Sequence, residues 1–217
     1  MSWIQQIFGD SVSFSQAVWV LLGGYVLGCF ATGYYLVRLV LGKDLRDMGS
    51  GNAGAKNAGR ILGKYGFWIT LLGDFGKGAL AVGITQYFTL NNHLAALAML
   101  AVVLGHIWPA QLRLRGGKGF ATSIGAISVY DIHLGLAFVG LFAGIFLILR
   151  RTTLTGLVAF ACLPLAARFM GHEFTSVVFI SFLAAFVLLA HWKNLIEEIA
   201  LLTARRSAEP DSDKPFK

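Results

Sequence analysis

Residues 94–119 read LAALAMLAVVLGHIWPAQLRLRGGKG, an apolar run that ends in a short basic turn rich in glycine. The apolar part, residues 94–112, approaches the roughly 20 residues that a helix needs to cross the hydrocarbon core of a bilayer. Two arginines and a lysine close the stretch, and such charges mark the cytoplasmic ends of membrane helices. This stretch therefore predicts a membrane-spanning helix whose basic end faces the cytoplasm.

The composition of the whole chain extends this interpretation to the other segments. Of the 217 residues, 56% are hydrophobic and only 13% are charged, whereas soluble domains carry roughly 25% charged residues. A composition this apolar also excludes a disordered chain. Long apolar stretches occur at residues 18–41, 68–88, 94–112, 120–130, 134–149, 154–169 and 174–190. We therefore expect an all-α integral membrane protein, a bundle of about seven transmembrane helices of which some are short.

The 18 lysines and arginines indicate the orientation of the bundle. They gather in the connections after the first, third, fifth and seventh apolar stretches, and none precedes Gln16. Because cytoplasmic connections carry the excess of positive charge, we expect the N-terminus outside and the C-terminus in the cytoplasm. Residues 1–202 are expected to form a single transmembrane domain. Residues 203–217 mix serine and proline with charges of both signs, which predicts a mobile cytoplasmic tail.

The net charge of +7 is typical either of nucleic-acid binding or of attraction to anionic lipid headgroups. The basic residues are spread over short connections and form no continuous stripe with stacking aromatics, so we expect membrane lipid and no nucleic acid as a partner. Cys29 and Cys162 lie in apolar runs without CxxC or histidine-rich spacing. Neither a disulfide framework nor a zinc site is predicted, and we expect no metal or cofactor.

The first basic connection contains GSGNAGAKNAGR at residues 49–60. Glycines permit backbone conformations in which consecutive N–H groups converge on an anion, and the hydroxyl and amide side chains add hydrogen bonds. The alternative is a flexible turn, since the segment lacks the GxxxxGK[ST] pattern of a phosphate-binding loop. The candidate ligand residues of this connection are Ser50, Gly51, Asn52, Gly54, Asn57 and Arg60.

The second basic connection is more informative, because Gly116, Gly117, Lys118 and Gly119 directly precede the helix expected from Phe120. Backbone N–H groups, the lysine charge and the positive end of the helix dipole can together hold a phosphate. Charge that merely sets topology beside a tight turn is the alternative. Topology requires basic residues but not three glycines around a lysine, so we favour an anion site.

Other ionisable residues occur in pairs three positions apart, which places both members on one helix face. Asp74 and Lys77 are expected to form an ion pair, either structural or ligand-binding. His191 and Asn194 are expected to face one cavity at the end of the last apolar stretch, with residues that snorkel to the interface as the alternative. His106 is expected to be a hydrogen-bonded structural residue. The sequence has no HxxxxD pair, GxSxG elbow or HExxH motif, so neither serine acyl transfer nor metal hydrolysis is indicated.

These connections resemble the motifs of the PlsY family, the bacterial acyl-phosphate:glycerol-3-phosphate acyltransferases. Residues 44–63 resemble its DIRxxGSGNPGATNxxRxxG, and GHIWPAQLRLRGGKGFAT at residues 105–122 resembles its GHxFPxFLxFKGGKGxAT. Thr153 keeps the hydroxyl of its RYxS stretch, and His191 and Asn194 match its HRxNIxRLxxGxE. The chain departs from the family where Ala53 replaces proline and Lys56 replaces threonine, and it loses most of the third motif after Asn194.

The resemblance implies a multi-pass enzyme of the bacterial cytoplasmic (inner) membrane. Such an enzyme transfers a fatty acyl group from acyl phosphate to the sn-1 hydroxyl of glycerol 3-phosphate, giving lysophosphatidic acid and phosphate for phospholipid synthesis. It implies that Gly116, Gly117, Lys118 and Gly119 cradle the donor phosphate. The implied catalytic residues are Ser50, Arg60, Lys118, His191 and Asn194, and the implied substrate-binding residues are Gly51, Asn52, Gly54, Asn57, Gly116, Gly117, Gly119 and Thr153.

Several alternatives stay open at this point. His191 is either a general base or a ligand of the acceptor. The departures from the family pattern are also compatible with a divergent member that acylates another acceptor. A transporter or a scaffold for phosphorylated lipid intermediates would use the same anion-binding connections. Acyl-chain preference and oligomeric state do not follow from the sequence.

Overall fold

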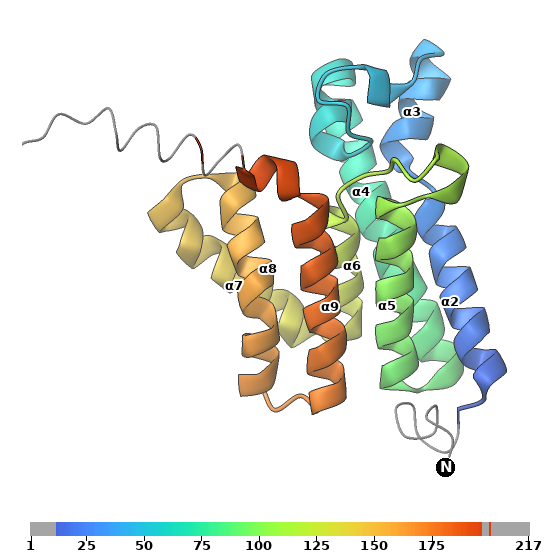
Figure 1. Ribbon diagram of the computed structural model, residues 1–217, viewed down its shortest axis with the longest axis vertical. Coiled ribbons are helices and arrows are strands. Elements are labelled where there is room, and N and C mark those ends of the chain that lie inside the picture. Colours follow the sequence, from blue (N-terminus) through green and yellow to red (C-terminus); the bar gives the residue numbers. More distant parts are fainter. Residues whose placement is uncertain (1–11, 197–199, 201–217) are drawn as a thin grey trace, which may run out of the picture.

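The computed structural model describes residues 12–196 and residue 200, and the described part is helical without strands (Figure 1). The α-helices are α2 (Phe14–Cys29), α3 (Thr32–Leu41), α4 (Ala55–Thr89), α5 (Asn92–Ile107), α6 (Phe120–Tyr130), α7 (Ile132–Leu149), α8 (Thr152–Phe169) and α9 (Phe174–Ala190). Two short 3₁₀ helices, η1 (Leu45–Asp47) and η2 (Ala110–Leu112), lie in the first two basic connections. The all-α prediction is confirmed.

Five segments of the described chain are long and apolar enough to cross a membrane, namely Phe14–Leu41, Ala55–Thr89, Asn92–Leu112, Ile132–Leu149 and Thr152–Phe169. The shorter apolar helices α6 and α9 complete the seven segments expected from the sequence. Large apolar side chains such as Trp19, Leu147 and Phe169 are exposed, as lipid-facing surfaces require. An integral membrane bundle with some short helices is therefore confirmed. The proposed tail, residues 203–217, lies outside the described residues.

The first predicted span is two helices instead of one. Helix α2 ends at Cys29 and α3 begins at Thr32, with extended backbone between them at Phe30 and Ala31. The freed carbonyl oxygens of Gly28 and Phe30 accept hydrogen bonds from the Lys77 ammonium at 3.0 and 2.6 Å. A buried cation on α4 therefore satisfies the backbone groups that the break exposes.

Helix α4 begins earlier than its apolar stretch predicts. It starts at Ala55 instead of near Trp68, so the second half of the glycine-rich connection is helical. Gly63 interrupts it with φ 69° and ψ −161°, a conformation that glycine adopts easily and other residues rarely do. The kink separates an amino-terminal part that carries Asn57 and Arg60 from the long apolar part.

Glycines bring neighbouring helices into close contact. A Cβ atom at Gly78 of α4 would overlap the Thr122 carbonyl of α6, and one at Gly125 of α6 would overlap the Phe75 carbonyl of α4. Such reciprocal close packing replaces the hydrophobic driving force that membrane helices lack. It fixes α6, and with it the connection that precedes α6, against α4.

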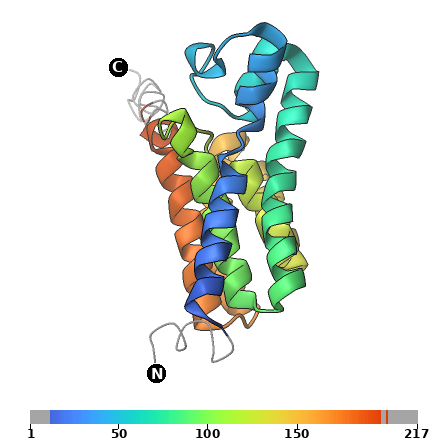
Figure 2. The same cartoon turned by 90° about the vertical axis from the view of Figure 1, so that its right-hand side faces the viewer.

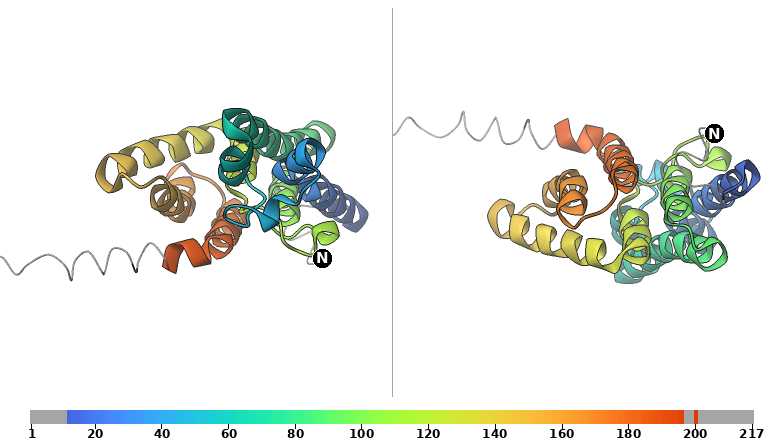
Figure 3. Two further views of the ribbon diagram at one scale, coloured as in Figure 1. Left: turned by 90° about the horizontal axis from the view of Figure 1, so that it is seen from above. Right: turned by 90° about the horizontal axis from the view of Figure 1, so that it is seen from below.

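The first three basic connections and the described start of the fourth lie at one end of the bundle. Figure 1 shows the tip of α3, the start of α4, the α5–α6 connection, the α7–α8 turn and the end of α9 at the end opposite the start of α2, and Figure 2 shows the same for α3, α4 and α9. In the end views α6 and α9 lie between the α2–α5 group and the α7–α8 pair (Figure 3). The alternation of basic and non-basic connections along the sequence thus places the basic connections together at one end of the bundle.

Candidate active site

The buried side chain of Asn57 holds the backbone of the glycine-rich connection in place. Its side chain is 1% exposed, and its amide nitrogen donates hydrogen bonds to the backbone oxygens of Leu45, Met48 and Asn52 at 2.9–3.1 Å. Its Oδ1 atom accepts the Ser50 N–H at 2.9 Å. A buried amide whose polar atoms are all paired fixes the loop around it. Asn57 therefore shapes the loop, and its contact with substrate stays a prediction.

The other candidate residues of this connection lie in one tight turn. Gly49 and Gly51 have φ of 57° and 71°, so both adopt the left-handed conformation that glycine tolerates. Asn52 Oδ1 accepts the Gly54 N–H at 2.7 Å just before α4 begins. Ser50 lies between the two left-handed glycines and is exposed. Its contact with a ligand stays a prediction.

Arg46 joins the first and second basic connections. Its guanidinium pairs with Asp44 at 2.6 Å and donates hydrogen bonds to the carbonyl oxygens of Leu112 and Arg115 at 2.6 and 3.3 Å. Hydrogen bonding from Arg46 holds the pKa of the Asp44 carboxyl below its ordinary value. Sequence reasoning placed Arg46 only in a family motif, because no local pattern reveals that it reaches the second connection.

Each glycine of the second connection is required by a different structural constraint. The N–H groups of Gly116 and Gly117 donate to the carbonyl oxygens of Ile107 and His106 at 3.1 and 3.0 Å. A Cβ atom at Gly117 would overlap His106 Nε2, and Gly119 has φ 78° as the N-cap of α6. The amides of Gly116 and Gly117 are thus used within the turn. The N–H groups left for an anion are those of the first turn of α6, which lack intrahelical partners.

A buried charged network lies beneath this turn. The Lys77 ammonium is 3.1 Å from Asp74 Oδ1 and 2.7 Å from His106 Nδ1, and all three residues are at most 6% exposed. The ammonium donates to Nδ1, so the hydrogen of the neutral imidazole is on Nε2, against Gly117. Such burial favours the structural ion pair over direct ligand binding for Asp74 and Lys77. It also confirms His106 as a hydrogen-bonded structural residue.

Lys118, His191 and Asn194 come together at the end of the bundle. The Lys118 ammonium donates a hydrogen bond to Asn194 Oδ1. His191 follows the last residue of α9, is 6% exposed, and donates from Nδ1 to the Val187 carbonyl at 2.8 Å. Its Nε2 atom is therefore the acceptor. Burial, together with the positive charges of Lys118 and Lys56, lowers the pKa of His191 to about 4.

Lys56 connects the start of α4 to the start of α8. Its ammonium donates to the hydroxyls of Thr152 and Thr153 at 3.2 and 3.1 Å. A hollow of about 350 Å³ opens beside it, lined by Lys56, Gly59, Arg60, Gly63, Lys64 and Phe67. The structure thus joins Thr153 to Lys56 and places Arg60 in the adjacent hollow. Among the described contacts, none joins Ser50 or Arg60 directly to Lys118.

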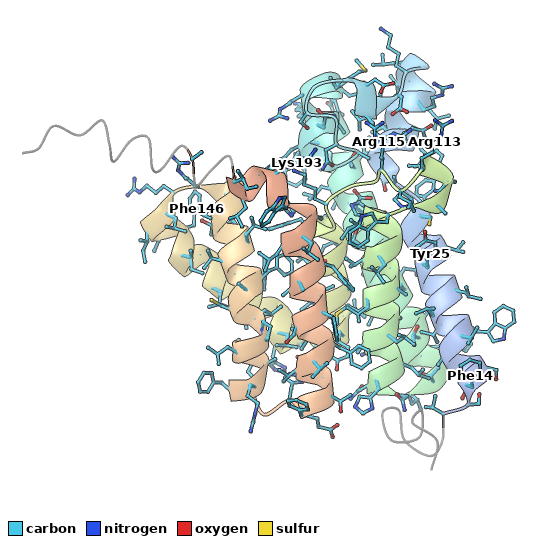
Figure 4. The ribbon with its side chains drawn as sticks, in the orientation of Figure 1. Phe14, Tyr25, Arg113, Arg115, Phe146 and Lys193 are labelled. Atoms are coloured by element: carbon cyan, nitrogen blue, oxygen red, sulfur yellow. The ribbon has the colours of Figure 1, made fainter. Side chains whose placement is uncertain are left out.

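A second hollow lies at the opposite end of the described bundle from this cluster. It measures about 500 Å³ and lies where His93 pairs with Glu173 and His172 pairs with Asp131. Within the described ranges, no group of three histidine, cysteine, aspartate or glutamate side chains is arranged to hold a metal ion. Figure 4 shows Arg113, Arg115 and Lys193 at one end of the bundle and Phe14 at the other.

A family model described as glycerol-3-phosphate acyltransferase matches residues 18–200. This chain belongs to that family. Glycerol-3-phosphate acyltransferase 1 of Desulfitobacterium hafniense is 45% identical to it over 189 residues, covering 87% of this chain and 94% of the relative. The glycerol-3-phosphate acyltransferase of Parasynechococcus marenigrum is 40% identical over 183 residues, covering 84% and 86% of the two chains.

Solved structures give the same result. The crystal structure of PlsY, an integral membrane glycerol 3-phosphate acyltransferase, matches in its glycerol 3-phosphate form with a TM-score of 0.77 and 30% identity. The match covers 87% of this chain and 93% of that one. The lysophosphatidic acid form matches with a TM-score of 0.74 and 29% identity. The family resemblance drawn from the loop motifs is therefore confirmed.

Proposed function

We propose that this protein transfers a fatty acyl group from acyl phosphate to the sn-1 hydroxyl of glycerol 3-phosphate, giving lysophosphatidic acid and phosphate. The observation that carries the proposal is the cluster of Lys118, His191 and Asn194 at the start of α6. It combines a fixed positive charge, helix amides and a neutral imidazole at the polar end of a membrane bundle. The 45% identity to a named glycerol-3-phosphate acyltransferase supports the same reaction.

The proposed location is the bacterial cytoplasmic membrane, with the N-terminus outside and the C-terminus inside. Support comes from the segregation of the basic connections to one end of the bundle (Figure 1). At that end a soluble phosphorylated acceptor from the cytoplasm can meet a donor whose acyl chain stays in the bilayer. Residues 1–202 would form the single catalytic domain.

The chemistry requires positioning and charge stabilisation more than a reactive side chain. The acceptor hydroxyl attacks the carbonyl carbon of the acyl phosphate, the new ester bond forms, and the bond to the phosphate oxygen breaks. Phosphate leaves with the electron pair, so no covalent enzyme intermediate is needed. In the proposal, Lys118 and the first N–H groups of α6 stabilise the charge that grows on the leaving phosphate.

The acceptor would be held by Ser50, Arg60, His191 and Asn194. His191 presents Nε2 as an acceptor, since Nδ1–H is bound to Val187. A pKa of about 4 keeps the ring neutral at neutral pH and makes it a weak base, which favours the ligand role over the general-base role. The acceptor's own phosphate, with a second pKa of about 6, is the better proton acceptor.

The test is an assay of the purified protein in bilayer discs with palmitoyl phosphate and glycerol 3-phosphate. Lysophosphatidic acid and phosphate should appear in equal amounts, and palmitoyl-CoA should not replace the donor. Lys118→Met is the matched inactive control. Folded protein that yields no product would refute the proposal. If such protein instead carried glycerol 3-phosphate into sealed vesicles, the transporter alternative would take its place.

A further inference from the structure

Lys56 is a cation at a position where the family motif has threonine, and it faces the proposed site. It is the second residue of α4, and its ammonium lies 3.2 and 3.1 Å from the Thr152 and Thr153 hydroxyls of α8. The charge of Lys56 also contributes to the lowered pKa of His191. Lys56 therefore extends from the start of α4 to the start of α8, whereas Lys118 lies at the start of α6.

The surroundings of Lys56 are suited to an oxyanion. Lys56 and Arg60 are four residues apart on α4, so they share a helix face, and both line the hollow of about 350 Å³. None of the residues that line this hollow is acidic. An ammonium also donates more strongly to an ionised phosphate oxygen than to a neutral hydroxyl. A phosphate that enters the hollow would therefore draw the ammonium from the two threonines.

We infer that Lys56 binds the phosphate of the acceptor substrate beside Arg60 and raises the affinity of this enzyme for a phosphorylated acceptor. The inference rests on the proposed function. Without substrate, the two threonine hydroxyls hold the ammonium at the mouth of the site. When glycerol 3-phosphate binds, at least one N–H of Lys56 turns to a phosphate oxygen. The acceptor is favoured over the donor because Arg60, the neighbour of Lys56, holds the acceptor in the proposed reaction.

A purely structural role would make a different prediction. Lys56 connects the start of α4 to the start of α8, so a mere tie between these helices would stabilise the fold whichever substrate is present. Loss of such a tie would lower the thermal midpoint and kcat together. Loss of a phosphate ligand would instead raise the KM of the acceptor selectively.

The experiment compares Lys56→Thr, which restores the residue of the family motif, with Lys56→Arg, which keeps the charge. KM is measured for glycerol 3-phosphate at saturating palmitoyl phosphate and for palmitoyl phosphate at saturating acceptor. We expect Lys56→Thr to raise the KM of glycerol 3-phosphate about tenfold, the effect of one charged hydrogen bond. The KM of palmitoyl phosphate should change less than twofold, and Lys56→Arg should retain most of the acceptor affinity.

Two control variants isolate the contact. Lys43→Thr removes the same charge from an exposed position in the same connection, and it should leave both KM values unchanged. Thr152→Val removes one hydroxyl partner of Lys56 but keeps its charge, and it should not raise the acceptor KM. A rise with Thr152→Val equal to that with Lys56→Thr would mean that Lys56 acts only as a tie.

The remaining outcomes separate this inference from the proposed function. Inactive, folded wild-type protein would refute the proposed function itself. Active wild-type protein with an unchanged acceptor KM in Lys56→Thr would refute only the role of Lys56. A selective rise in the KM of palmitoyl phosphate would assign Lys56 to the donor phosphate and overturn the inference as stated.

Discussion

The Lys118 ammonium donates a hydrogen bond to the Asn194 side-chain oxygen, which joins the start of α6 to the segment that follows α9. The contact holds the cation beside His191, whose pKa it helps to lower. A long lysine side chain loses much rotamer freedom when it is held in this way. Asn194 therefore orders the Lys118 side chain before substrate binds, and the proposed reaction depends on that side chain.

Lys118→Met should lower kcat/KM about a hundredfold or more, because it removes a charge that stabilises the leaving phosphate. Asn194→Ala should lower kcat/KM about tenfold, since the Lys118 charge stays but its side chain is less well ordered. In the double variant Asn194→Ala should add less to Lys118→Met than it costs alone, because it still removes an acceptor contact but no longer affects the position of Lys118. Steady-state kinetics of the four proteins measure this coupling. Fully additive effects would show that Asn194 acts independently of Lys118.

His191 should make stability depend on pH. Its pKa is about 4 in the folded protein against an ordinary 6.5, so folding favours the neutral ring. Stability from this group is complete above about 6.5 and is lost as pH falls toward 4, by up to about 3 kcal/mol. Thermal unfolding at pH 7 and pH 4.5 measures the loss, which His191→Gln should abolish. Parallel pH curves for the wild type and the variant would contradict this prediction.

Gly117→Ala should displace the turn before Lys118, because the added Cβ atom would overlap His106 Nε2. We expect activity to fall more than tenfold and stability to fall by about 1–3 kcal/mol, as in other overpacked sites. Gly76→Ala is the matched control, since a Cβ atom there meets nothing within 4 Å. Activity and thermal midpoint are measured for both variants. Equal behaviour of the two would show that the turn tolerates displacement.

Lys77→Met should be among the most destabilising single changes in the described chain. It leaves the Asp74 carboxylate buried without its cation and removes the donor to Gly28 and Phe30. Breaking a buried pair in this way costs about 3–5 kcal/mol. The double variant with Asp74→Asn should recover part of the loss. Denaturation in mixed micelles compares the three proteins, and a double variant no more stable than Lys77→Met would argue against the pair.

The sequence predicted the helices well where polar punctuation marks both ends. Helix α6 runs over residues 120–130 as expected, because Gly119 caps its start and Asp131 its end. The expected start of the next helix near Trp68 was wrong: α4 begins at Ala55, because residues 55–60, which resemble a flexible loop in sequence, are helical. Buried hydrogen bonds of Asn57 to three backbone oxygens hold them in place. Hydrogen bonds between residues that are distant in sequence leave no recognisable pattern in the local sequence.

The break at Phe30 and Ala31 escaped prediction for a related reason. Neither residue is glycine or proline, and the group that satisfies the exposed carbonyl oxygens, the Lys77 ammonium, lies on another helix. For the candidate site, family motifs supplied the residues, but only the structure separates their roles. It assigns Gly117 to packing against His106 and sets Lys56 against Thr152 and Thr153.

The brevity of α6 bears on how a fatty donor arrives. Eleven residues rise about 16 Å, roughly half the hydrocarbon thickness of a bilayer. Tyr130, its last residue, lines the hollow at the end opposite Lys118, and we therefore expect the amides at its start to lie below the headgroup layer. A donor can therefore offer its head to these amides without desorbing, its tail still dissolved among neighbouring lipids. Turnover should then follow the surface mole fraction of acyl phosphate in the membrane and not its amount per volume of buffer.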